Sequence, residues 1–161
     1  MTGEENGRWK GGVNPVYDEL RSEISGWQQK SMEFCGYKCV ITSSIFHHIH
    51  HIIPFHKIIS EAFEIAGLPI LSKVMDYNPN DFKQLRALIC DLHIKYGYGA
   101  CLNRDVHKLF HDEYGYMNFT LLNFMDFINK IEQGYYNNWF ETNNYDIIIN
   151  RNFIDYLSRL Q

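Results

Sequence analysis

The sequence predicts an α+β fold that contains more helix than strand. Apolar residues recur at three- and four-residue steps in several segments, as one face of an amphipathic helix requires. Between these segments lie short β-branched or apolar runs bounded by glycine, proline or serine, which indicate strands. Apolar residues make up 45% of the 161 residues, which is enough for a hydrophobic core, and the length predicts one domain.

The first third of the chain is predicted to contain an arm, a helix and two extended segments. Residues 1–14 are polar and glycine-rich, as in a flexible arm. Pro15 suits the first turn of the helix, because its missing N–H is not needed there. The β-branched run Lys38–Thr42 predicts a short strand, and Ile45–Ile53 predicts an extended stretch that Pro54 ends.

The remaining elements are predicted to be mainly helical, with caps and glycines marking their ends. A helix at 55–66 ends at Gly67, and another opens at Asn80 or Asp81 and runs to about Tyr96. A strand is predicted at Ala100–Leu102, and the next helix starts near Val106, is capped by Asn103 or Asp105 and ends at Tyr114–Gly115. Thr120 opens a further helix, and the last helix is predicted at Asn152–Leu160.

Composition and charge exclude several classes of protein. The 15 Lys and Arg against 19 Asp and Glu give a net charge of −4, which excludes a globally basic nucleic-acid binder but not a local basic patch. No apolar run approaches the roughly 18 residues of a membrane helix. The first residues carry no secretory signal. We therefore expect a soluble, cytoplasmic protein.

The cysteines allow two interpretations. In a protein that is not secreted, reduced thiols are expected first. The alternative is a zinc site, because the CGYKC spacing falls within the range that zinc ligands tolerate. The four cysteines are Cys35, Cys39, Cys90 and Cys101.

The eight histidines are clustered, and their spacing indicates a metal site. His107 and His111 are four residues apart on a predicted helix, so their imidazoles can converge on one ion. The segment HHIHH at 47–51 lies in the extended stretch, where successive side chains point to opposite faces. His50 and His51 therefore cannot do the same job, and one of them can face a metal while its neighbour faces a substrate, as a ligand beside a general base requires. A solvated edge strand without chemistry is the alternative.

The two histidine groups resemble the signatures of the HNH nucleases of the His-Me finger superfamily. HHIIPF (His50–Phe55) is similar to the end of the family's first strand, and CLNRDVHKLFH (Cys101–His111) to its strand-to-helix segment. WKGG at 9–12, LRSEISGWQQKS at 20–31 and YKCVIT at 37–42 look like the N-terminal part of phage and intron-encoded homing endonucleases of this type. The resemblance covers about residues 8–117.

The resemblance implies a ββα-metal finger, in which two strands and a helix surround one divalent ion, with additional helices inserted between the strands and flanking them. It implies that His50, His107 and His111 hold the ion. It also implies that His51 is the general base that takes a proton from the attacking water.

Two further catalytic candidates follow from the resemblance. Asn103 is the candidate for the family's middle asparagine, which orients the general base, although Tyr98 or Gly99 falls around the usual position. Arg104 or Lys108, beside the ligand helix, would neutralise phosphate charge in the transition state.

The expected domain organisation is an arm at 1–14, a nuclease domain at 15–133 and a C-terminal tail or helix at 134–161. The finger core would occupy about 38–55 and 99–113, with a helical insertion at 56–96. The expected function is a phage-type DNA endonuclease or nicking enzyme that cuts double-stranded DNA with one divalent ion, Mg²⁺ or Mn²⁺ before Zn²⁺. A homodimer or a phage partner protein would add DNA contacts.

Two other interpretations stay open at this point. In the first, a zinc ion stabilises a catalytically silent module that binds DNA or protein. In the second, the chain is a helical domain whose histidines and cysteines are incidental.

Overall fold

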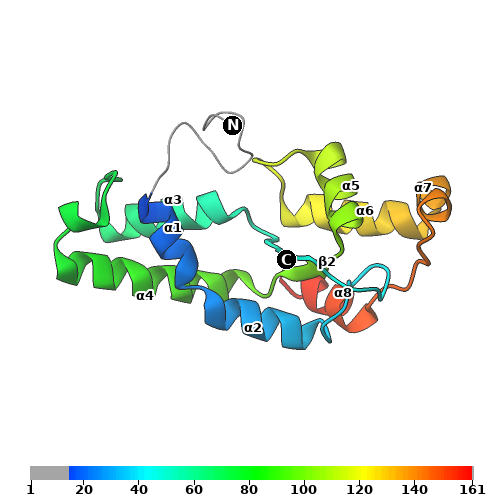
Figure 1. Cartoon of the computed structure of the whole chain (residues 1–161), viewed down its shortest axis with the longest axis horizontal. Helices are drawn as coiled ribbons and strands as arrows, with labels where there is room; N and C mark the ends of the chain where they lie inside the picture. The colour runs from blue at the N-terminus through cyan, green and yellow to red at the C-terminus, as the bar shows by residue number, and fades with distance from the viewer. Residues whose placement is uncertain (1–14, 161) are drawn as a thin grey trace.

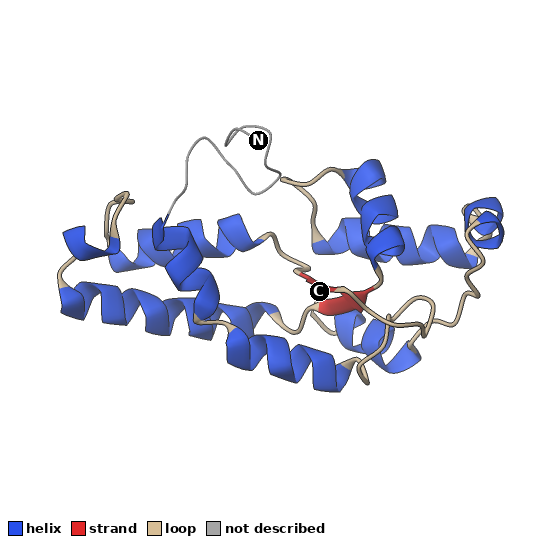
Figure 2. Cartoon of the chain, in the orientation of Figure 1, coloured by secondary structure: helices blue, strands red, loops and turns tan. Residues whose placement is uncertain are grey.

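The computed structural model describes residues 15–160, which form a mostly helical molecule with one small antiparallel sheet near its middle (Figures 1 and 2). The helices that precede the second strand are α1 (Pro15–Ser22), α2 (Ser25–Phe34), α3 (Phe55–Ala66), the 3-10 helix η2 (Val74–Asp76) and α4 (Pro79–Tyr96). The strands are β1 (His48–His50) and β2 (Ala100–Leu102), and the later helices are α5 (Arg104–Tyr114), α6 (Leu121–Glu132), α7 (Asn137–Thr142) and α8 (Arg151–Ser158).

The α+β prediction is confirmed for this part of the chain, and helix predominates as expected. The predicted N-terminal arm lies outside the described residues. No helix within 15–160 combines the length and the apolar character needed to cross a bilayer.

The sheet joins two segments that are about fifty residues apart in the sequence. Ile49 of β1 lies opposite Cys101 of β2, and His50 lies opposite Ala100. The approach of β2 to β1 depends on Gly99, because a Cβ there would lie 2.5 Å from Ile49 Cγ2 and 2.8 Å from Trp27 Cη2. These contacts leave no room for a larger residue, and they bring α2, β1 and the start of β2 together.

The buried apolar residues form two hydrophobic clusters, of which one includes strand β2, and the two together account for the elongated outline in Figure 1. We call the first the helical cluster; it is formed by α1, α3 and α4 through Val16, Leu20, Phe55, Ile58, Ile59, Ala62, Phe63, Phe82, Leu85, Ile89 and Leu92. We call the second the strand cluster; it contains β2, α5, α6 and α8 and includes Ala100, Cys101, Leu102, Val106, Phe110, Phe124, Phe127, Ile128, Phe153 and Leu157.

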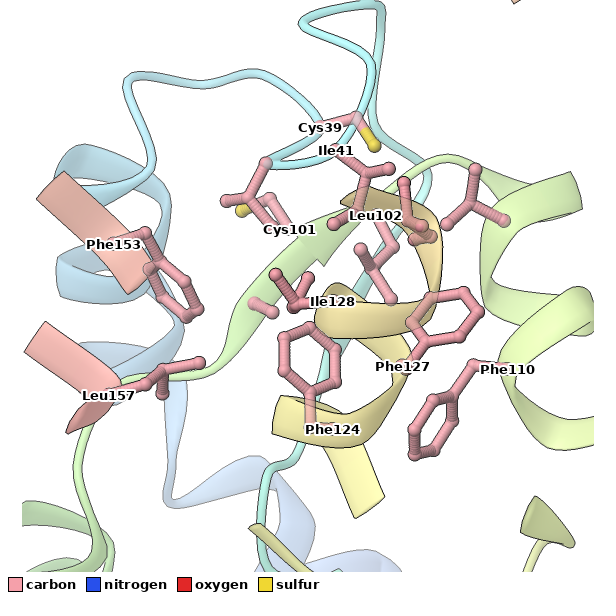
Figure 3. Close-up of a cluster of buried hydrophobic side chains, with 14 of the residues drawn as sticks. Cys39, Ile41, Cys101, Leu102, Phe110, Phe124, Phe127, Ile128, Phe153 and Leu157 are labelled. Carbon is pink, nitrogen blue, oxygen red and sulfur yellow. The ribbon is translucent and has the colours of Figure 1, made fainter. Parts of the chain in front are cut away.

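The C-terminal segment is part of the strand cluster. Figure 3 shows Phe153 and Leu157 of α8 facing the same core as Phe124 and Ile128 of α6. Phe153 and Leu157 are both fully buried. The segment before α8 is tied to the body of the protein, because Ile148 N–H donates to the carbonyl of Ile41 at 2.8 Å.

Several element ends follow from local chemistry that the sequence displays. Helix α3 has the predicted bounds and ends at Gly67, whose φ of 67° is the left-handed conformation that glycine adopts readily. Thr120 opens α6 through a capping box with Asn123. Strand β2 also has its predicted bounds.

The predicted strand at Lys38–Thr42 is wrong, because this segment folds into turns. Tyr37 and Ser43 both adopt positive φ angles of 58°, and the turn is closed by a 2.9 Å bond from Ser43 N–H to the carbonyl of Cys39. Val40 is still buried, and its N–H donates to the carbonyl of Cys101. The β-branched residues thus mark core positions, and the turn residues set the backbone conformation.

Other boundaries differ from the prediction. The helix that begins at Pro15 ends at Ser22, and α2 begins at Ser25. Between them, the N–H groups of Glu23 and Ile24 donate to carbonyls three residues back rather than four. The extended stretch at 45–53 contains a strand only at His48–His50. Helix α4 is capped by Asn78 rather than by Asn80 or Asp81, and α7 was not predicted.

Candidate metal centre

Three histidines from β1 and α5 converge at the edge of the strand cluster. His50 ends β1, while His107 and His111 lie one turn apart on α5. His107 Nε2 lies 3.1 Å from His50 Nδ1 and 3.0 Å from His111 Nε2. Within the described residues, these three form the one group of three or more His, Cys, Asp or Glu side chains whose donor atoms all lie within 4.8 Å of one another.

His50 is held in place by aromatic rings. Its ring centroid lies 4.7 Å from that of Phe110, 4.9 Å from Phe119 and 5.5 Å from Phe124, and the side chain is buried. Its Nε2 atom has no hydrogen-bond partner. Burial, followed by the charges of His107 and His111, holds the pKa of His50 well below its usual range. The ring is therefore neutral and presents Nδ1 to the other two histidines.

Hydrogen bonds on the outer nitrogens orient the two helix histidines. His111 Nδ1 donates to the carbonyl of Gly115 at 2.8 Å, which leaves a lone pair on Nε2. His107 Nδ1 lies 2.9 Å from Nδ1 of His48, which is an exposed residue of β1. When His107 donates to His48, its Nε2 lone pair also points to the centre. Such outer bonds are typical of histidines that bind metals.

The three inner nitrogens, His50 Nδ1, His107 Nε2 and His111 Nε2, are better satisfied by a bound cation than by hydrogen bonds among themselves. One proton can satisfy only one pair of nitrogens, and the remaining lone pair would face another lone pair. Burial lowers the pKa of His107 to about 3, with smaller contributions from His111 and His48, and burial also lowers the pKa of His111. All three rings are neutral at pH 7, as metal ligands must be. The cluster can therefore hold one divalent ion.

His51 lies on a different face of the chain, as strand alternation predicts. Its ring stacks on Trp27 with centroids 4.4 Å apart, and its Nε2 lies 3.2 Å from Nε2 of His93. His93 Nδ1 lies 2.7 Å from the carbonyl of Ile89 and donates to it. His93 Nε2 is thus an acceptor, and His51 Nε2 donates to it. The contacts of His51 are with this group and not with the three convergent histidines.

Burial, followed by the charges of His93 and Arg21, lowers the pKa of His51 to about 3. His51 is neutral at pH 7 and remains partly accessible to solvent. The sequence offered no signal for His93, which lies on the buried face of α4 among apolar residues. Its pairing with His51 depends on how α4 packs against β1, which a local pattern does not reveal.

The structure places Asn103 as a helix cap rather than as a partner of His51. Its Oδ1 accepts from Val106 N–H at 2.8 Å, and its Nδ2 donates to Thr42 Oγ1 at 3.2 Å and Ser44 Oγ at 3.3 Å. The residue is buried. These bonds anchor the start of α5, and with it His107 and His111, to the turn at 42–44.

Asn103→Ala is expected to lower the free energy of unfolding by about 1–3 kcal/mol, because it removes the cap of α5 and the buried hydrogen bonds from Asn103 Nδ2 to Thr42 and Ser44. Urea denaturation measures this effect. Asn150→Ala, which removes the cap of α8, is the matched control. Loss of cleavage in fully folded Asn103→Ala protein would contradict a purely structural role for Asn103.

The two predicted phosphate-binding residues differ in how free their charges are. Arg104 is exposed at the start of α5, where its backbone N–H donates to His47 Nδ1 at 3.0 Å. Its charge contributes to a lowered pKa of His48, behind burial and His47. Lys108 is paired with Asp112 at 2.7 Å, so its charge is partly neutralised.

The four cysteines do not assemble into a zinc site. Cys101 N–H donates to Cys35 Sγ at 3.3 Å within the strand cluster. Cys90 instead lies on α4, where its thiol donates to the carbonyl of Glu23 at 3.5 Å. All four are free thiols.

Comparisons with known proteins leave the family open. No family model matches the chain, and no solved structure matches it. Over 65 residues, which are 38% of this chain, it is 39% identical to the SPbeta prophage-derived uncharacterized protein YomD of Bacillus subtilis (strain 168). The match covers 24% of that protein, so the chain spans about a quarter of the length of the relative. The similarity connects part of this chain to a prophage protein.

Proposed function

We propose that this chain is a metal-dependent DNA endonuclease or nicking enzyme of the HNH type, built on a ββα-metal finger formed by β1, β2 and α5. The observation that carries the proposal is the convergence of three histidines, with His50 coming from β1 and His107 and His111 from α5. The partial similarity to a prophage protein agrees with the phage origin that the sequence resemblance implies.

In the proposed reaction, His51 takes a proton from the water that attacks the scissile phosphate. His51 is neutral at physiological pH, and Nδ1, the ring nitrogen that does not donate to His93, carries the lone pair that takes the proton. The negative charge of a bound phosphate would raise the pKa of His51 from about 3 toward the working pH, where a general base is most effective. The 3.2 Å contact with His93 and the stacking on Trp27 fix the ring. Arg104 offers positive charge at the exposed end of the ligand helix.

A divalent ion bound by His50, His107 and His111 would polarise the phosphate and stabilise the departing 3′-oxygen. Three imidazoles without a carboxylate favour Zn²⁺ or Ni²⁺, whereas Mg²⁺ and, less strictly, Mn²⁺ prefer oxygen ligands. Of the ions expected from the sequence, Zn²⁺ thus fits this donor set best and Mg²⁺ least. Three protein ligands also leave coordination positions for water and phosphate, as catalytic sites require.

A zinc-stabilised binding module without catalysis is the second candidate. The burial of His50 among phenylalanines favours it, because such a ligand ties the ion to the hydrophobic core. The endonuclease and the binding module would both hold one ion at the three histidines, but only the endonuclease would cleave DNA.

A plasmid-nicking assay tests the proposal. Purified protein is incubated with supercoiled plasmid in EDTA and in Mg²⁺, Mn²⁺ or Zn²⁺, and the bound metal is measured on the same protein. We expect metal-dependent conversion to open-circular or linear DNA, with Mn²⁺ or Zn²⁺ more effective than Mg²⁺. A stoichiometric ion with no cleavage under any condition would favour the binding module instead.

A further inference from the structure

A cation from α1 lies beside the face of the chain that carries His51. Arg21 is in the last turn of α1, and its guanidinium carbon lies 4.1 Å from the centroid of the Phe55 ring. The Phe55 ring in turn lies 5.5 Å from His51 and 5.9 Å from His93. The guanidinium is therefore held over an aromatic face next to the pair of histidines.

The charge of Arg21 is available to a ligand. The residue is exposed, and no carboxylate within residues 15–160 forms an ion pair with it. Arg86, by contrast, is paired with Glu19 at 2.8 Å. Partial burial of the guanidinium lowers the pKa of Arg21, and the charge of Asp18 acts in the opposite direction. The positive charge of Arg21 contributes to the lowered pKa of both His51 and His93, which shows that it acts on this face.

The chemistry of this group fits a phosphodiester. A guanidinium offers several N–H donors in a planar fork that matches two phosphate oxygens, and stacking on an aromatic ring leaves its edge free to donate. A protein with a net charge of −4 needs such local cations to approach DNA.

We propose that Arg21 binds a backbone phosphate of the DNA strand on which His51 acts. This inference rests on the proposed function, and it adds a phosphate contact from a helix outside the two strands and helix that surround the candidate metal site. Arg21 and the metal-binding histidines would then contact the same strand from two sides of β1.

The test is the salt dependence of DNA binding, measured by fluorescence anisotropy with a short labelled duplex in EDTA, where no cleavage occurs. Each phosphate contact contributes about 0.9 to the slope of log affinity against log salt. Arg21→Gln should reduce the slope by about 0.9, while Arg21→Lys should keep the slope and bind more weakly. Arg151→Gln is the control, because Arg151 of α8 is already paired with Glu132 of α6. This substitution should leave the slope unchanged.

In the nicking assay, Arg21→Gln should lower kcat/KM by roughly 10- to 100-fold, the effect of losing a charged hydrogen bond. Circular dichroism and thermal melting confirm that each variant is folded. Unchanged slope and cleavage in Arg21→Gln, with an active wild-type enzyme, would overturn the Arg21 contact and leave the nuclease standing. Failure of the wild-type protein to bind DNA would also overturn it. Binding with the expected slope change but without cleavage would support the contact and contradict the nuclease.

Discussion

His107→Ala is expected to abolish both metal binding and DNA cleavage. His107 Nε2 is the central atom of the candidate site, within 3.1 Å of His50 Nδ1 and 3.0 Å of His111 Nε2. Its removal leaves two imidazoles on opposite sides of a gap, and two neutral ligands hold a divalent ion far more weakly than three do. Metal content per chain, measured by mass spectrometry after gel filtration, should fall from one to near zero.

Thermal melting measures the same loss independently of activity. An ion at 100 times its Kd stabilises the folded protein by about 2.7 kcal/mol. For a chain of this size, that corresponds to a rise in Tm of roughly 5–10 °C. The wild-type protein should show this rise, and His107→Ala should not.

His56→Ala is the matched control for His107→Ala. His56 lies on α3, outside the candidate site, and its ring hydrogen-bonds to the carbonyl of Met117. It should keep the metal, the rise in Tm and the cleavage. A full complement of metal in His107→Ala would show that the three histidines do not form the site.

The sequence predicts the candidate metal ligands because each depends on a short-range rule. His107 and His111 share a helix face through their four-residue spacing, and the helix is opened by the adjacent Asn103. Strand alternation separates His50 from His51. That β1 would pair with β2 and bring His50 to α5 was implied only by the resemblance, since the two strands are separated by two long helices.

The surroundings of His51 could not be predicted in the same way. Trp27, His93 and Arg21 come from three helices, and their positions depend on how those helices pack against β1. The apolar periodicity of α4 identifies its buried face, but it does not distinguish a histidine that contacts another core residue from one that contacts His51. The residues around the proposed base are therefore determined by tertiary packing, and local sequence patterns do not identify them.

The turn at 37–43 shows a second reason why the sequence did not predict the structure. Val40 and Ile41 are buried as strand residues would be, yet Tyr37 and Ser43 adopt left-handed backbone angles that β propensity does not anticipate. The resulting turn places Thr42 and Ser44 against Asn103. An asparagine that the resemblance marked for catalysis thereby serves to fix the ligand helix.

His51→Ala is expected to abolish cleavage while the metal stays bound. Removal of a general base lowers the rate by about 10²–10⁴-fold. The inner nitrogens of His50, His107 and His111 are not among the contacts of His51, so the metal content and the metal-dependent rise in Tm should be unchanged. The nicking assay and the metal analysis on one preparation measure both quantities.

Because His51 also packs on Trp27 and donates to His93, alanine removes structural contacts together with the proposed base. His51→Gln separates the two effects, since its amide N–H can still donate to His93 Nε2 while an amide cannot accept a proton at neutral pH. We expect His51→Gln to melt close to the wild-type protein and to remain as inactive as His51→Ala. Cleavage by His51→Gln at the wild-type rate would remove His51 from the reaction. The hydrogen-bonded pair of His51 and His93 would then be a structural contact between the end of β1 and α4, and the base would have to be sought at the exposed His47 and His48.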